Sequence, residues 1–258
     1  MTASIAFEGI DNFRDFGGYR TRHGAVMATG RLFRSGHHAR ATDQDLERLA
    51  DLGIGVIVDL RRPNERERDV ARRWPGFGGV VIDSDVGQQS LDEWQEFIAR
   101  SDLTPASFQN YMLDYYRQAP AEPRHIDLYR RYFRALAEGR GGILVHCTAG
   151  KDRTGIACAL TQHIAGVHDD DILHDYLLTN DPARIEARIG LVRQAIGDNI
   201  GRTPSEEAVR IAISVDAAYL AQAFEAMRER FGSIDGYLED ALGIDAALRD
   251  RIHDKLLG

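Results

Sequence analysis

The chain has few of the residues that mark several common protein classes. Only two of its 258 residues are cysteines, and only two, Lys151 and Lys255, are lysines. Two cysteines cannot form the disulfide framework of a small secreted domain. No apolar run approaches the ~20 residues that span a bilayer, so we expect no stable membrane insertion. The first residues have neither a basic segment nor an apolar signal core, which predicts a cytoplasmic location and leaves only unconventional export open.

The charge balance excludes another class of function. The formal net charge is −8, and such a chain does not bind nucleic acid through its overall field. Any anionic ligand must be held by local groups instead. The sequence contains no internal repeat, low-complexity tract or linker, so we expect residues 1–258 to form a single domain.

Apolar runs alternate with amphipathic segments along the first two thirds of the chain. Continuous apolar runs are typical of strands that are buried on both faces, and their alternation with helices indicates an α/β fold with a largely parallel central sheet wrapped by helices. The predicted strands cover 54–60, 79–83 and 143–146, the predicted helices cover 43–52 and 126–137, and 25–34 forms a weak hairpin or edge strand.

Residues 88–122 differ from their surroundings, because they are polar but carry aromatic anchors such as Trp94, Phe97 and Phe108. Their spacing fits amphipathic helices inserted between a strand and a helix. The helices either pack on the core or form a lid over a site at the sheet edge. From 168 to 258 the pattern is helical to the end.

The most informative stretch follows the third predicted strand. Its residues 147–152 read Cys-Thr-Ala-Gly-Lys-Asp, and Arg153 and Thr154 open an apolar helix. A short glycine-bearing loop at a helix N-terminus forms a concave anion site from backbone N–H groups. Cys147 at its start is a candidate nucleophile, since cationic neighbours favour the thiolate, and the planar fork of Arg153 matches two oxygens of a phosphate. The candidate substrate-binding residues are Thr148, Ala149, Gly150, Lys151 and Thr154, whose hydroxyl can donate to the sulfur.

Other interpretations of this stretch fit less well. Cys158 lies among alanine and leucine on the following helix, which is typical of a core residue. A Cys147–Cys158 disulfide would have to cover too long a separation. A nucleotide-binding loop needs Ser or Thr after its lysine and a glycine five residues before Gly150, and both are missing. No second cysteine or paired histidine lies at zinc-ligand spacing, so no metal is expected.

The run from His146 to Gly155 matches the signature of cysteine-dependent protein tyrosine and dual-specificity phosphatases. The chain resembles their bacterial branch over nearly its whole length. Further segments carry this resemblance: Asn12-Phe13-Arg14-Asp15, Arg31 to Ser35, Asp59-Leu60-Arg61-Arg62, Asp175-Tyr176-Leu177, Asn180-Asp181 and Tyr237-Leu238.

The resemblance implies the family's α/β fold, a helical lid at 88–122 and the family's chemistry. In that reaction Cys147 attacks phosphorus, and water hydrolyses the phosphocysteine. Arg153 and the backbone amides of residues 148–153 stabilise the equatorial oxygens. It implies no metal and no cofactor, phosphotyrosine proteins as substrates, and inorganic phosphate as a ligand of the loop. Phosphoinositides or a dual-specificity range remain an alternative, because Lys151 next to the clamp also occurs in lipid phosphatases. An inactive phosphate-binding module is a remote alternative.

The general acid is the step that the sequence leaves open. Eukaryotic relatives place the general acid in a Trp-Pro-Asp loop. The similar stretch in this chain, Trp74-Pro75-Gly76, lacks the aspartate. Asp152, inside the loop itself, is the first candidate, and Asp85, after the second predicted strand, is the second.

Several charged residues outside the loop are expected to be mainly structural. Their opposite charges could form ion pairs beneath the loop. These residues are Asp15, Asp59, Arg14, Arg34 and Arg61. The run of charged residues from 65 to 73 is expected to be a solvated helix face.

Overall fold

The computed structural model describes residues 6–87 and 93–257, so the first five residues of the predicted 88–122 insertion lie outside it. Five strands form one sheet in the order β1-β2-β5-β3-β4, in which β1 is antiparallel to β2 and the other pairings are parallel. The strands are β1 (Arg14–Asp15), β2 (Leu32–Ser35), β3 (Ile54–Asp59), β4 (Val80–Ile82) and β5 (Gly142–His146).

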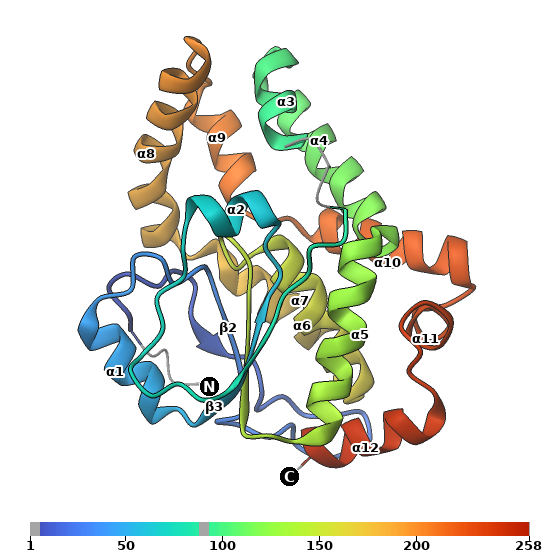
Figure 1. Ribbon diagram of the computed structural model, residues 1–258. Coiled ribbons are helices and arrows are strands. Elements are labelled where there is room, and N and C mark those ends of the chain that lie inside the picture. The colour runs from blue at the N-terminus through green and yellow to red at the C-terminus, as the bar shows by residue number, and fades with distance from the viewer. Residues whose placement is uncertain (1–5, 88–92, 258) are drawn as a thin grey trace.

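Helices surround this sheet and extend beyond its carboxyl edge (Figure 1). The first group is α1 (Asp43–Asp51), α2 (Pro63–Arg68), α3 (Glu93–Arg100), α4 (Pro105–Gln118), α5 (Pro123–Glu138) and α6 (Asp152–Ile164). The second is α7 (Asp169–Leu177), α8 (Pro182–Ile200), α9 (Glu206–Ile213), α10 (Ala217–Phe231), α11 (Ile234–Gly236) and α12 (Ala246–Leu256). Short turns are η1 (Ala119–Ala121), η2 (Leu178–Asn180) and the π-helical η3 (Tyr237–Ala241). Among the described residues, no helix combines the length and apolar character needed to cross a membrane.

The central strands β3 and β5 are buried on both faces, as their continuous apolar runs predict. The prediction of a buried strand over 79–83 was wrong, because β4 lies at the edge of the sheet and Val80 and Val81 are 42% and 40% exposed. Val56 and Val58 of β3 face the larger apolar cluster, which α5, α6, α10 and α12 complete. Ile57 of the same strand faces a smaller cluster that α1 covers. Because successive side chains of a strand point to opposite faces, each apolar residue of β3 enters one of two cores. The predicted α/β class, its parallel sheet and its helices are confirmed.

The weak strand predicted over 25–34 lies at a different position in the sheet than expected. Its ordered part, β2, lies between β1 and β5 inside the sheet, so the expectation of an edge strand was wrong. Arginine makes the segment look solvent-facing in the sequence. Arg34 is nevertheless fully buried, because Asp175 and the carbonyl of Gly150 accept its hydrogen bonds.

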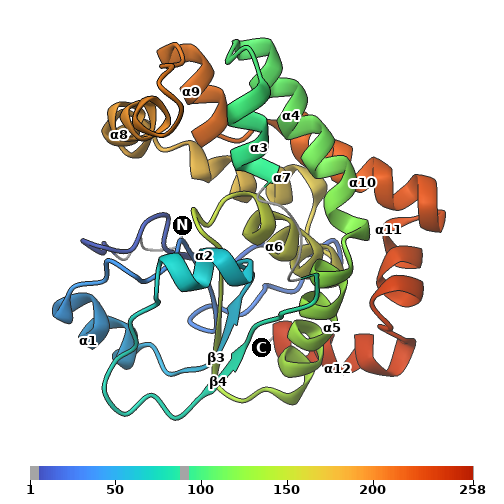
Figure 2. The same cartoon turned by 45° about the horizontal axis from the view of Figure 1, so that its top comes forward.

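A third apolar cluster lies apart from the sheet, beyond the carboxyl ends of the strands. It joins Ile98 and Phe108 of α3 and α4 to Ile189 and Val209 of α8 and α9. Figures 1 and 2 show these four helices rising together above α2 and α6. The predicted amphipathic helices of 88–122 are therefore present as α3 and α4, and two helices from the C-terminal part of the chain pack against them.

Candidate active site

The loop that the sequence singles out lies where the chain passes from β5 into α6. Residues 147–151 connect the last residue of the strand to the first residue of the helix. Cys147 is buried, with 2% of its surface exposed, and both cysteines are free thiols. The loop thus opens onto the N-terminus of α6, which favours negative charge.

The loop's carbonyl groups are tied to the surrounding protein. The carbonyl of Thr148 accepts from the backbone N–H of His37 at 3.1 Å. The carbonyl of Gly150 accepts from Asn12 Nδ2 at 2.8 Å and from Arg34 Nη2 at 2.9 Å. With these acceptors used, the loop is held in one conformation from outside.

The loop's amide groups are not used in this way. Within the described ranges, none of the N–H groups of 148–151 donates to a protein acceptor. Gly150 has a φ of +67°, and a Cβ there would lie 2.4 Å from the carbonyl carbon of Ser35. Glycine is therefore required on both steric and conformational grounds. Successive unpaired amides in such a turn form an anion-binding cradle.

Arg153 is oriented by a residue that the sequence analysis misplaced. Glu65 of α2 accepts from Arg153 Nη1 at 2.5 Å and from Nη2 at 2.8 Å, and it also pairs with the hydroxyl of Thr148. The carbonyl of Leu60 accepts a further bond from Nη1 at 3.1 Å. The Nε–H of Arg153 donates to no acceptor in the described part of the chain, so this edge of the guanidinium is available to a phosphate oxygen.

The prediction of a solvated helix face over 65–73 is therefore wrong at its first residue. Glu65 has a side chain only 15% exposed, and the helix ends at Arg68. Burial opposes the charge of Glu65, but the Arg153 guanidinium and hydrogen bonds from Arg153 and Thr148 outweigh burial and hold its pKa well below the usual range. Local sequence could not show this, because the partner lies 88 residues away.

Asp152 lies in the same cavity as the loop. Its Oδ1 accepts a hydrogen bond from the hydroxyl of Tyr116 at 2.8 Å and lies 3.3 Å from Lys151 Nζ. The side chain is 18% exposed and lines the cavity that Thr148 and Arg153 also line. A carboxyl group in this place can reach the leaving oxygen of a phosphoester held by the loop.

Asp85, the second candidate for the acid, is placed differently. It forms an ion pair with Arg66, its side chain is 67% exposed, and it does not line this cavity. Geometry therefore favours Asp152. The stretch Trp74-Pro75-Gly76 also lies away from the cavity, because Trp74 packs in the apolar cluster that α1 covers.

The ammonium of Lys151 is buried under the helices that rise above the sheet. It donates to the carbonyls of Ala212 at 2.6 Å and Ser214 at 3.1 Å, at the end of α9. Burial lowers the pKa of this ammonium, and the nearby carboxylate of Asp152 opposes the shift. Three acceptors thus match its three N–H groups, so Lys151 links the loop to α9.

Two more of the predicted residues lie at the loop without a side-chain bond. Ala149 lines the cavity. Thr154 is fully buried, and its hydroxyl has no hydrogen-bond partner among the described residues. The expected bond from this hydroxyl to the sulfur of Cys147 is therefore not formed in the structure.

Two of the arginines that were expected to pair beneath the loop, Arg14 and Arg34, do form such pairs. Asp175 of α7 accepts from Arg14 Nε at 3.1 Å and from Arg34 Nη1 at 3.0 Å, and Arg34 continues to Gly150. Their buried charges are paired, as burial requires.

A second pair lies at the end of β3. Arg61 donates to Asp59 at 2.8 and 2.7 Å, and His146 Nε2 lies 3.7 Å from the same carboxylate. Burial lowers the pKa of His146 to about 4, although Asp59 opposes the shift, so the ring is neutral at pH 7. Asp15 instead accepts from the backbone of Gly17 and Gly30.

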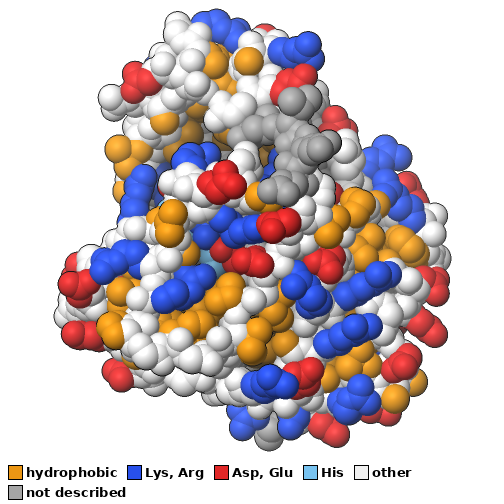
Figure 3. Space-filling model, viewed as in Figure 1, with side chains coloured by type: hydrophobic (Ala, Val, Ile, Leu, Met, Phe, Trp, Pro, Cys, Tyr) orange, Lys and Arg blue, Asp and Glu red, His pale blue; other side chains and the backbone are white. Residues whose placement is uncertain are grey.

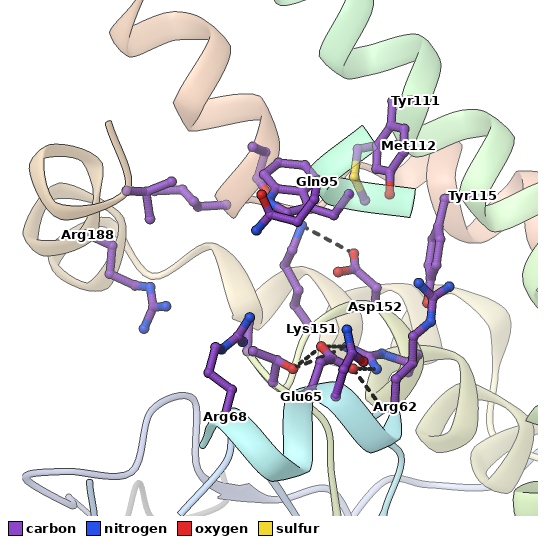
Figure 4. Close-up of a pocket in the computed structure, with 18 of the residues that line it drawn as sticks. Arg62, Glu65, Arg68, Gln95, Tyr111, Met112, Tyr115, Lys151, Asp152 and Arg188 are labelled. Carbon is purple, nitrogen blue, oxygen red and sulfur yellow. Dashed lines mark hydrogen bonds and ion pairs between the residues drawn. The ribbon is translucent and has the colours of Figure 1, made fainter. Parts of the chain in front are cut away.

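The cavity above the loop has a volume of about 330 Å³. Figure 4 shows Arg68 and Arg188 reaching into its side from α2 and α8, and Tyr111, Met112 and Tyr115 lining it from α4. Arg62 and Arg184 also line it. In the space-filling view, Lys and Arg side chains gather on the face below the upper helices (Figure 3). A chain with a net charge of −8 thus concentrates positive charge around one cavity.

Comparisons with known proteins identify the family of the chain. A model of the tyrosine phosphatase family matches residues 5–258. A Cupriavidus necator protein named as a tyrosine-protein phosphatase is 36% identical over 243 residues, which cover 94% of this chain and 85% of that protein. The chain therefore belongs to the tyrosine phosphatase family and is a phosphoric monoester hydrolase.

Similarity extends to one particular relative over its full length. The triple specificity protein phosphatase PtpB of Mycobacterium tuberculosis is 33% identical over 279 residues, with 97% of this chain and 98% of that protein covered. The resemblance to the bacterial branch of the family is thereby confirmed. A crystal structure of P. aeruginosa TpbA matches 75% of this chain and 87% of that chain at 18% identity, with a TM-score of 0.30.

Proposed function

We propose that this enzyme hydrolyses phosphotyrosine at Cys147 through a phosphocysteine intermediate. One observation carries the proposal: the carbonyls of Thr148 and Gly150 are bonded outward, the amides of 148–151 have no acceptor in the described part of the chain, and Glu65 fixes Arg153 at the rim of the loop. Such preorganised donors stabilise the charge on the equatorial oxygens of a transferring phosphoryl group.

Each step of the reaction has a group in reach of the loop. The thiolate of Cys147 attacks phosphorus, the bond from phosphorus to the tyrosine oxygen breaks, and Asp152 gives that oxygen its proton. The Asp152 carboxylate then takes a proton from water, whose oxygen attacks phosphorus. The S–P bond breaks, and inorganic phosphate leaves with the thiolate restored.

Replacing each candidate aspartate by asparagine tests which of them is the general acid. Asp152→Asn should lower kcat/KM, which reports the transfer to Cys147, by ~10²–10⁴-fold on phosphotyrosine peptide, but far less on 4-nitrophenyl phosphate, whose leaving group needs no proton. Asp85→Asn is the matched control and should behave as the wild type on both substrates. A crippled Asp85→Asn beside a nearly normal Asp152→Asn would reverse the assignment.

The arginines of the cavity favour a second candidate substrate, a multiply phosphorylated inositide. Arg68 and Arg188 have side chains 54% and 37% exposed, although Asp69 and Asp11 pair with them. A bidentate fork matches phosphate well. The ammonium of Lys151, by contrast, already donates its hydrogen bonds to backbone carbonyls. The arginines are therefore better placed to bind a second phosphate.

A substrate panel separates the two candidates. Arg188→Ala should reduce phosphate release from an inositol bisphosphate lipid more than from a phosphotyrosine peptide. Arg193→Ala, on the same helix but outside the cavity, is the control. Equal losses on both substrates would remove the reason to expect lipid activity. Lys151→Ala in the same panel tests whether Lys151 contributes to lipid activity, as its occurrence in lipid phosphatases implies.

Two further expectations stay proposals. The helices α3 and α4 are a candidate lid, together with α8 and α9, whose apolar cluster they share. The cytoplasmic location is to be tested by cell fractionation.

A further inference from the structure

We propose that Tyr116 is a positioning residue that holds Asp152 for proton transfer, and that Tyr176 fixes Tyr116 in turn. The inference rests on the proposed role of Asp152 as the general acid. No feature of the sequence marks Tyr116, which lies in the 88–122 insertion, 36 residues before Asp152.

The three groups form one chain of hydrogen bonds. The hydroxyl of Tyr116 lies 2.8 Å from Asp152 Oδ1 and 2.7 Å from the hydroxyl of Tyr176. Burial and the neighbouring Asp152 raise the pKa of Tyr116 well above its ordinary value, so the hydroxyl keeps its proton. Its single proton goes to Asp152, and Tyr176 must therefore donate to Tyr116. A directed chain of this kind strengthens each of its bonds.

This arrangement decides which oxygen of Asp152 carries the acid proton. Oδ1 accepts from Tyr116 and faces the ammonium of Lys151, as the dashed line in Figure 4 marks. An oxygen with two donors aimed at it is a poor place for a proton. The proton of the acid form is therefore on Oδ2, the oxygen left to meet the leaving group of the substrate.

The position of Tyr116 is fixed by its packing. Its side chain is fully buried and stacks on Tyr219 of α10, with ring centroids 5.5 Å apart. Phe108, two turns earlier on α4, belongs to the cluster above the sheet, whereas Met112 and Tyr116 belong to the main core. The C-terminal half of α4 is thus anchored in the core and presents the hydroxyl of Tyr116 to Asp152.

The test removes single hydroxyl groups and varies the leaving group. Tyr116→Phe should lower kcat/KM about 10-fold on phenyl phosphate, the loss expected for one hydrogen bond to a charged group, and leave kcat/KM on 4-nitrophenyl phosphate nearly unchanged. Tyr176→Phe should show the same dependence on the leaving group with a smaller loss. Tyr132→Phe is the matched control, because Tyr132 is equally buried but bonds to Thr161 in the core.

A merely structural role would give a different pattern. Equal losses on both substrates for Tyr116→Phe, or losses no larger than those of Tyr132→Phe, would overturn the proposal. If Tyr116→Phe does not fold, a uniform loss in Tyr176→Phe overturns it equally. In the Asp152→Asn background, Tyr116→Phe should cost nothing more, and an additional loss there would also overturn it. Should Asp152→Asn itself show no dependence on the leaving group, the assignment of the acid fails instead.

Discussion

Replacing Glu65 by glutamine tests how the phosphate clamp is held. The pair with Arg153 is nearly buried, with side chains 15% and 13% exposed. Removing one partner of such a pair typically costs ~3–5 kcal/mol, because the other charge stays buried without compensation. Glutamine keeps one acceptor, so we expect Glu65→Gln to lower the free energy of unfolding by about 3 kcal/mol at pH 7.

The pH dependence of this loss follows from the pKa of Glu65, which the folded state lowers. A carboxyl group with a lowered folded pKa stabilises fully above its unfolded pKa, about 4.3, and loses that contribution as the pH falls toward the folded value. The difference between wild type and Glu65→Gln should therefore be constant from pH 7 to about 5 and narrow below about 4. Urea unfolding at a series of pH values measures it.

Activity gives a second measure of the same change. A clamp that is misplaced by about 1 Å can cost ~10²-fold in rate, so kcat on phosphotyrosine peptide should fall by ~10–10²-fold. Glu186→Gln is the control, because the exposed pair of Glu186 with Arg210 contributes at most about 1 kcal/mol. A loss below 1 kcal/mol that does not change between pH 7 and 3, with unchanged kcat, would refute this account of Glu65.

Three further predictions concern the loop and the chemistry. Gly150→Ala should lower the free energy of unfolding by more than about 2 kcal/mol in urea, because its Cβ would meet the backbone of Ser35; wild-type stability would contradict the described turn. Lys151→Met should speed amide hydrogen exchange in α9, because it leaves the carbonyls of Ala212 and Ser214 without their donor; unchanged exchange would contradict the link. Full activity is expected in excess chelator, and a strict metal requirement would count against thiol chemistry.

The parts of the site that are contiguous in the sequence were predictable from it. The strand, the loop and the helix from Gly142 to Ile164 follow one another, and an apolar run, a glycine and an apolar helix each have local signals. Cys147, Asp152 and Arg153 could be selected because their neighbours are polar in an otherwise apolar stretch. The support from Arg14 and Arg34 could also be predicted, since buried arginines require partners.

The parts brought together by the fold could not be predicted in the same way. Glu65 lies in a charged run in which nothing in the local sequence distinguishes one glutamate from the next. Only the packing of α2 beside the loop places Glu65 against Arg153. The helices α8 and α9 could be predicted as helices, but their place above the loop depends on apolar contacts with α3 and α4. Likewise Tyr116 looks like one more core aromatic, because its hydroxyl finds Asp152 only in three dimensions.

Trapping the covalent intermediate tests the central claim most directly. Acid quenching of the enzyme during turnover of phosphotyrosine peptide, followed by mass spectrometry of its fragments, should place a phosphate on the fragment that contains Cys147. Cys147→Ser should carry none and should not turn over, while it still binds the peptide. Appreciable hydrolysis by Cys147→Ser, or phosphate trapped on another residue, would contradict the account.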